Sequence, residues 1–240
     1  MLSFLANPDR FMAFSRWAAP MFGVLAGLLI AVGLWLGFAA PEDYQQGDTV
    51  RMMFIHVPAS WLALFVYLCL GVASFLSLVF RHALADAAAK AAAPLGAVFT
   101  ALALITGSLW GKPMWGTWWV WDARLTSVLV LLLFYLGYIA LWSAVEDPDT
   151  AADLTSVLCI VGSVFAVLSR YAVNFWNQGL HQGASLSLDK KENVSDVFYL
   201  PLLICIAGFI LLFVTLVLLR TRTEIRARRL QALLARERLA

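Results

Sequence analysis

Tryptophans crowd one short stretch of this sequence. Five of the chain's ten tryptophans fall within the twelve positions from Trp110 to Trp121. The simpler interpretation is an aromatic belt, because indole side chains favour the interface between lipid and water. If residues 115–122 are helical, four of them share one face at i, i+3, i+4 and i+7 spacing: Trp115, Trp118, Trp119 and Asp122. Such a face would be a flat aromatic platform beside a carboxylate, which suits a planar apolar ligand.

The residues around these indoles fit the same interpretation. Gly111 and Gly116 have no side chain, so a ligand could approach the backbone closely at either position. Trp121 extends the aromatic stretch by one further ring. Asp122 either orients a ligand or caps the helix that follows it, since aspartate is a preferred helix N-cap.

Two histidines stand in segments on either side of the tryptophan stretch. His56 comes just before an apolar run, which we expect to begin at residue 57 with Pro58 in its first turn. His181 lies between the last two apolar runs. Neutral imidazole is a common axial ligand of haem iron, and two imidazoles from opposite sides would saturate it. A lone interfacial histidine is more often a hydrogen-bonding residue, so the joint placement of the two carries the prediction.

Two arginines extend this candidate site. The guanidinium forks of Arg51 and Arg124 suit the two carboxylates that a haem carries. Snorkelling from a helix end towards the water is an equally good interpretation of both. The third histidine, His82, stands beside Arg81 on the other side of the expected membrane, where we expect a solvated loop.

The composition predicts the elements that must position these side chains. Of the 240 residues, 62% are hydrophobic and 13% are charged, and the apolar excess must face lipid. Each apolar run is long enough to cross a hydrocarbon core of about 30 Å as a helix. We therefore expect an all-α membrane bundle, a single domain over residues 1–240. Its six spans are expected at 18–40, 57–80, 93–110, 125–143, 153–172 and 197–219.

The orientation of these spans follows from the arginines. Seven arginines follow the last span, at positions 220, 222, 226, 228, 229, 236 and 238. Because cytoplasmic flanks accumulate Lys and Arg, both termini and the tail 220–240 are expected in the cytoplasm. The tryptophan segment 111–124 then faces outward with both flanking histidines. The tail could be an amphipathic helix on anionic lipid, or no more than a topology anchor.

Several other functions are excluded by the sequence. A net charge of +2 with its basic residues gathered in the tail does not indicate nucleic-acid binding. The run from Gly107 to Pro113 has the wrong spacing for an ATP-binding P-loop. Three cysteines lie inside apolar runs without CxxC or CxxCH spacing, so a covalent haem attachment site is absent from the sequence.

The tryptophan stretch also carries a family signature. Residues 115–122 read WGTWWVWD and fit the WGxxWxWD pattern of the tryptophan-rich (WWD) haem-handling proteins. With six spans and a histidine-bearing segment on each side of the motif, the chain resembles the haem exporter protein C family of bacterial cytochrome c maturation. The resemblance covers essentially the whole chain.

The resemblance implies a role for each candidate residue. His56 and His181 would be axial ligands of a transient, non-covalently bound haem b, and Arg51 and Arg124 would bind its propionates. The motif would pack on the macrocycle through Trp115, Gly116, Trp118, Trp119, Trp121 and Asp122.

The resemblance further implies a multi-pass protein of the bacterial inner membrane that is not an enzyme. It would present haem to a periplasmic haem chaperone, beside the ATPase and permease subunits of an ABC transporter, a small single-span accessory protein and membrane lipid. A bis-histidine electron-transfer cytochrome and a purely structural membrane subunit are the alternatives. The first is disfavoured because its ligands usually lie within the spans, whereas both histidines here are expected at loop or mouth positions.

Overall fold

A computed structural model describes residues 7–175 and 194–238 of the chain. The regular structure of these residues is helical, apart from one isolated bridge between Asp43 and Gly47. The helices are α2 (Pro8–Ala39), the short 3₁₀ helix η1 (Asp48–Met52), α3 (Met53–Phe80), α4 (Ala83–Trp115), α5 (Ala123–Ala144), α6 (Pro148–Phe175) and α7 (Asp196–Glu237).

Six of these helices are long and apolar enough to cross a membrane, which confirms the all-α bundle. Each expected span falls on one of them, and the helix continues beyond the apolar run at one or both ends. Polar caps set some of these ends. The Asn7 side chain accepts hydrogen bonds from the backbone N–H groups of Asp9 and Arg10 at the start of α2.

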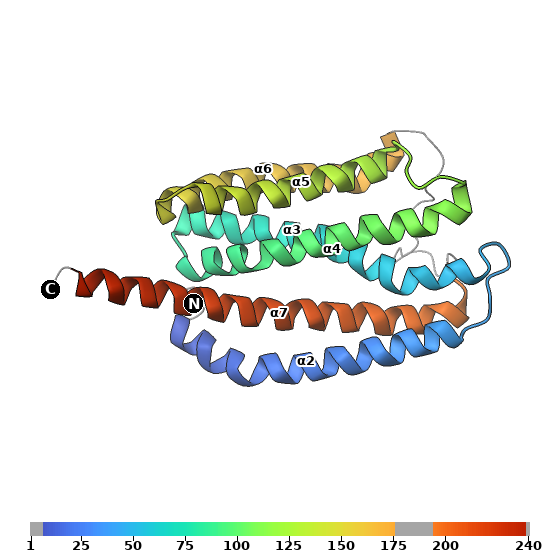
Figure 1. The fold of residues 1–240 in the computed structure, drawn as a ribbon, viewed down its shortest axis with the longest axis horizontal. Helices are drawn as coiled ribbons and strands as arrows, with labels where there is room; N and C mark the ends of the chain where they lie inside the picture. The colour runs from blue at the N-terminus through green and yellow to red at the C-terminus, as the bar shows by residue number, and fades with distance from the viewer. Residues whose placement is uncertain (1–6, 176–193, 239–240) are drawn as a thin grey trace.

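The helices pack as three pairs (Figure 1). α2 lies along α7 at the bottom of the view, α5 lies along α6 at the top, and α3 and α4 fill the middle layer. Helices alternate in direction, so the chain ends and the α3–α4 and α5–α6 connections gather at one end, here called the termini end. The connection 40–52 and the tryptophan loop 116–122 gather at the opposite end, here called the loop end.

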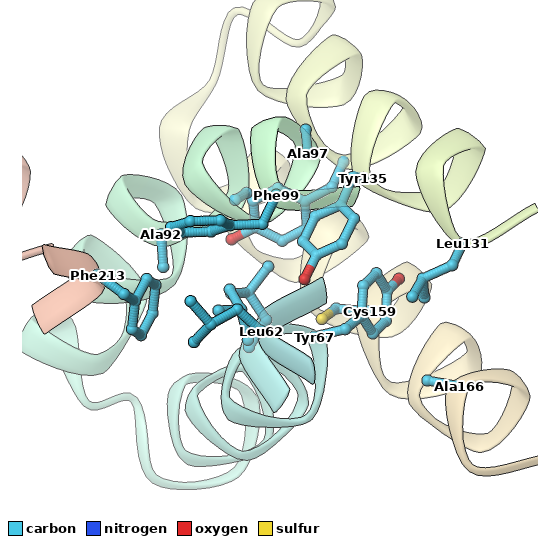
Figure 2. Close-up of a cluster of buried hydrophobic side chains, with 14 of the residues drawn as sticks. Leu62, Tyr67, Ala92, Ala97, Phe99, Leu131, Tyr135, Cys159, Ala166 and Phe213 are labelled. Carbon is cyan, nitrogen blue, oxygen red and sulfur yellow. The ribbon is translucent and has the colours of Figure 1, made fainter. Parts of the chain in front are cut away.

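Tyrosine rings fill the core between α3, α4, α5 and α6 (Figure 2). Tyr135 is fully buried and its hydroxyl donates to the carbonyl oxygen of Ala63, at 2.8 Å. A Cβ on Gly96 would lie 2.2 Å from the Tyr135 ring, and one on Gly162 would lie 2.1 Å from the Tyr67 hydroxyl. Small residues at helix contacts are what membrane bundles need, because lipid tails are as apolar as leucine and association depends on close packing.

A charged network closes the termini end. Glu224 of α7 accepts from Lys90 of α4 at 3.0 Å and from Arg228 at 2.9 Å, and Arg228 also pairs with Asp86 at 2.7 Å. The Lys90 ammonium lies 4.3 Å from the ring centroid of Trp142 in α5. Three helices are therefore joined where they leave the apolar layer.

The tail continues α7 without a break. α7 runs for 42 residues to Glu237, and Figure 1 shows its last turns extending in line with the rest of the helix. The tail is therefore helical through Glu237 as part of α7, and its association with anionic lipid stays a prediction. The exposed leucines of this extension project from the end of the bundle: Leu230, Leu233 and Leu234.

Candidate functional site

The candidate site lies at the loop end, where α2, η1, α3, α4 and α7 converge. Phe54 is fully buried there, between Ala40 at the end of α2 and the side chains of Phe198 and Leu202 in α7. Gly37 makes this packing possible, because a Cβ at that position would lie 2.5 Å from the Phe54 ring. His56 follows two residues later in α3, so the packing of Phe54 holds the backbone next to it in place.

His56 lies inside a helix, which corrects the expectation of a loop position. η1 runs directly into α3, which begins at Met53 rather than near residue 57. Pro58 consequently stands in the second turn of α3 and not in the first. The apolar pattern marks where the helix enters lipid, whereas the helix itself begins as soon as its backbone can form hydrogen bonds, here through the preceding 3₁₀ turn.

The imidazole of His56 is half-buried between α3 and α4. Its Nδ1 lies 3.0 Å from Thr106 Oγ1, and its Nε2 lies 3.3 Å from Ser60 Oγ. The Trp110 ring stands perpendicular to it, with centroids 5.6 Å apart. A Cβ on Gly107 would lie 3.0 Å from His56 Cε1, so α4 offers the ring a close backbone surface. The orientation of the imidazole is thus fixed from both helices.

The connection 40–52 is tied to α4 beside this histidine. The indole N–H of Trp110 donates to Gln46 Oε1 at 3.0 Å. Arg51 pairs with Asp48 at 2.7 Å and donates to the Ala40 carbonyl oxygen at 3.5 Å. Its Nε is buried without a hydrogen-bond partner among the described residues. A buried donor of this kind is destabilising until an acceptor reaches it.

The tryptophan segment is a loop, so the predicted helical platform is wrong. α4 ends at Trp115, and Gly116 follows in the left-handed region with φ of 75°. The Lys112 ammonium donates to the Gly116 carbonyl oxygen at 2.9 Å. Asp122 has extended backbone angles and accepts from the Leu125 N–H at 2.7 Å, which makes it the N-cap of α5. Residues 116–122 thus lie between the end of α4 and the start of α5. The four residues expected on one helical face do not share one: Trp115, Trp118, Trp119 and Asp122.

The indole side chains of this loop lie in different environments. Trp118 and Trp121 are exposed by 55% and 67%. Trp119 is half-buried and packs edge to face on Trp121 at 5.5 Å. Within residues 7–175 and 194–238, its buried Nε1 has no hydrogen-bond partner. Gly111 is covered by Trp115, since a Cβ there would lie 2.8 Å from that ring. Gly111 therefore accommodates a tryptophan, not the ligand that its lack of a side chain suggested.

A second arginine joins Arg124 at the start of α5. Arg124 is half-buried, and the charges of Arg170 in α6 and of Asp122 act on it. Arg170 is not among the candidate residues predicted from the sequence. Its position near the end of the expected span 153–172 is the signal that could have identified it. The structure brings the two cations together because α5 and α6 pack side by side and both reach the loop end.

Of the other two histidines, the structure describes only His82. His181 lies outside the described residues. His82 is not a free loop residue, because its Nδ1 accepts from the Ala85 backbone N–H at 3.1 Å and caps α4. Its role is structural, at the end opposite the tryptophan loop.

The described part of the site is rich in hydrogen-bond donors. Arg51 and Trp119 each carry a buried N–H without an acceptor in the part of the chain that the structure describes. Arg124 and Arg170 add positive charge, and His56 brings an imidazole, a common metal ligand. Exposed indoles border these groups. The arrangement suits a flat, apolar molecule that carries carboxylates and a metal ion.

Comparison with known proteins agrees with this description. The family model described as Heme exporter protein C matches residues 1–236. The chain is 61% identical to Heme exporter protein C of Paracoccus denitrificans over 232 residues, 97% of this chain and 96% of that protein. It is 59% identical to the Rhodobacter capsulatus protein of the same name, over 98% of both chains. Identity to the Escherichia coli K12 protein is 45%, over 92% of this chain and 89% of that one. The chain therefore belongs to the Heme exporter protein C family.

Proposed function

We propose that this chain binds haem at its loop end and presents it to a periplasmic haem chaperone during cytochrome c maturation. The observation that carries the proposal is the half-buried His56 imidazole, at the same end of the bundle as the buried nitrogens of Arg51 and Trp119, which have no partner among the described residues. An imidazole suits the iron, and charged or N–H donors suit the propionates. Relatives that cover nearly the whole chain carry the name Heme exporter protein C.

Each residue would contribute a separate interaction. His56 and His181 would be the axial ligands of a non-covalently bound haem b. Arg51 and Arg124 would bind the propionates, with the Trp119 N–H as a further donor. The rest of the motif, from Trp115 and Gly116 through Trp118 and Trp121 to the Asp122 cap, would form the surface against which the macrocycle edge rests.

The surroundings of the chain follow from this role. The loop end would face the periplasm and the arginine-rich termini end the cytoplasm of the bacterial inner membrane. The ABC transporter subunits and a small single-span protein would assemble with the bundle within membrane lipid. Reporter fusions test the orientation: one after Ala240 should be active in the cytoplasm, and one near Lys112 in the periplasm. Reversed signals would contradict the proposal, because every suggested ligand depends on sharing one face.

Absorption spectra of the protein purified in detergent test the ligands. His56→Ala and His181→Ala should each lower haem retention or shift the Soret band, and added imidazole should restore part of the spectrum. His82→Gln is the matched control, since His82 caps a helix at the other end. Wild-type spectra in both loop-end variants would refute the assignment.

Haem presentation is tested separately on the exposed indoles. Trp118→Ala with Trp121→Ala should reduce covalent haem on the chaperone without reducing the amount of chain in the membrane. Trp35→Ala is the control, because Trp35 of α2 is 70% exposed yet lies outside the tryptophan loop. Normal chaperone loading in the double variant would return both residues to an aromatic belt.

One observation favours the electron-transfer alternative. His56 lies within a helix, as ligands of membrane cytochromes usually do. The two functions predict different fates for the haem. A carrier loses its haem to the chaperone in a purified two-component mixture, whereas a cytochrome keeps it and cycles between redox states. Retention of all haem in that mixture would favour the cytochrome.

A further inference from the structure

The two ring nitrogens of His56 face two different hydroxyl groups. Thr106 Oγ1, on α4, lies 3.0 Å from Nδ1, and Ser60 Oγ, one turn further along α3, lies 3.3 Å from Nε2. A neutral imidazole has one N–H donor and one lone-pair nitrogen, so the two hydroxyls cannot have the same role. Which nitrogen carries the proton decides which one can bind a metal.

The hydrogen bonds of Thr106 settle this choice. Its hydroxyl donates to the backbone carbonyl oxygen of Leu102 at 2.7 Å, the shortest contact that it makes. With its only proton used in that bond, Oγ1 is an acceptor towards His56. Nδ1 is then the N–H donor, and Nε2 carries the lone pair and accepts from the Ser60 hydroxyl.

The ring has little freedom to exchange these roles. Gly107 lies against Cε1, and Trp110 stands edge to face against the imidazole at 5.6 Å. Thr106, Gly107 and Trp110 occupy i, i+1 and i+4 positions of one helix, so a single surface of α4 holds the ring. Histidines that bind metals almost always donate their second N–H to a fixed acceptor, which sets tautomer and orientation.

Resting on the proposed role of His56 as an axial ligand, we propose that Thr106 is a positioning residue that keeps the proton on Nδ1. Nε2 is then the nitrogen that binds iron. Ser60 holds Nε2 in the haem-free chain, and its hydroxyl turns away when Nε2 donates its lone pair to the metal. No proton leaves His56 in this exchange. The site is preorganised by Thr106, and Ser60 competes with iron, which favours release of a cargo.

The tautomer can be measured without haem. In the full-length chain labelled with ¹⁵N-histidine and purified in detergent, NMR shifts distinguish protonated from lone-pair nitrogens, and His56→Gln and His82→Gln assign the signals. We expect the proton of neutral His56 on Nδ1. His82 provides an internal contrast, because its Nδ1 accepts from Ala85 and its proton must be on Nε2. A proton on Nε2 of His56 would overturn the inference.

Haem titration tests the consequence for binding. Thr106→Val keeps the shape of the side chain and should weaken haem affinity, followed at the Soret band, by about 10- to 100-fold. Thr106→Ser should restore it. Thr100→Val is the matched control, since Thr100 makes the same bond to a carbonyl oxygen four residues earlier in α4 but does not contact His56. Ser60→Ala should tighten binding by about 2- to 10-fold, the effect of removing one competing neutral hydrogen bond.

The outcomes separate this inference from the proposed function. Wild-type haem binding by His56→Ala would remove His56 as a ligand and refute the proposed site. Loss of binding in His56→Ala together with unchanged binding in Thr106→Val would leave the ligand in place and refute only the positioning role. Equal losses in Thr106→Val and Thr100→Val would also refute it, since the effect would then come from α4 as a whole.

Discussion

The buried N–H of Trp119 allows a prediction whose sign changes with haem. Trp119→Phe removes a donor that has no partner among the residues that the structure describes, whereas Trp110→Phe removes one that is bonded to Gln46 at 3.0 Å. Both substitutions remove the same part of an indole ring. The difference between the two variants therefore isolates the N–H group.

The magnitude follows from the two environments. A buried unpaired donor costs about 1–3 kcal/mol, and a neutral hydrogen bond contributes about 0.5–1.5 kcal/mol. Trp119→Phe removes the cost of the unpaired donor and Trp110→Phe loses the hydrogen bond, so the free energies of unfolding of the two variants should differ by roughly 2–4 kcal/mol. At about 2–4 °C per kcal/mol for a chain of this size, Trp110→Phe should melt ~4–15 °C below Trp119→Phe. With haem present, Trp119→Phe should lose a bond to a propionate worth about 1.5–3 kcal/mol, a weakening of roughly 10- to 150-fold.

Thermal unfolding in detergent and a haem titration of the same samples test both halves of this reasoning. Trp142→Phe, which removes a buried indole N–H at the termini end, should leave haem affinity unchanged. Equal melting temperatures of Trp119→Phe and Trp110→Phe would refute the energetic reasoning. Wild-type haem affinity in Trp119→Phe would refute the contact with a propionate.

Substitutions at three further positions test the loop and the charged network. Asp122→Ala should lower stability by about 1 kcal/mol in thermal unfolding, whereas Asp122→Asn should retain most of the wild-type stability, since both aspartate and asparagine cap helices. An equal loss of stability in both variants would show that the charge matters more than the cap. Gly116→Ala should cost about 1–2 kcal/mol in the same assay because of its positive φ, and Gly116→Asn less; wild-type stability of both would contradict the left-handed turn. Glu224→Gln should lower the melting temperature by several degrees, because it leaves Lys90 and Arg228 together without their shared carboxylate. Arg81→Gln breaks an exposed pair with Asp153 and should leave the melting temperature nearly unchanged, so equal effects would refute the difference in burial.

The lipid-facing part of the fold could be predicted from the sequence. Apolar runs have a minimum length in a bilayer, so their number and approximate position follow directly. The places where helices begin and end outside lipid depend on local hydrogen bonds instead. α4 extends back to Ala83 because His82 caps it, and α3 begins at Met53 because η1 supplies its first turn.

The tryptophan loop shows both the value and the limit of local patterns. The sequence identifies the residues of the motif, but the helical face expected for residues 115–122 is not present. Two residues indicate a loop instead: Gly116 is a typical residue after a helix end, and Asp122 is a typical N-cap. The contacts of His56 have no comparable signal. Thr106 lies fifty residues further along the chain, and only the packing of α3 on α4 brings the two together.

α7 is one continuous helix that connects the two ends of the molecule. At 1.5 Å per residue its 42 residues span about 63 Å, roughly twice the hydrocarbon thickness of a membrane. Its first turns pack through Phe198 and Leu202 on Phe54, two residues from His56, and its last turns carry exposed leucines among arginines. If the helix tilts as a unit, a rotation of 10° about its midpoint displaces its far tip by ~5 Å. A tilt of this single helix would therefore move side chains at both ends of the molecule at once.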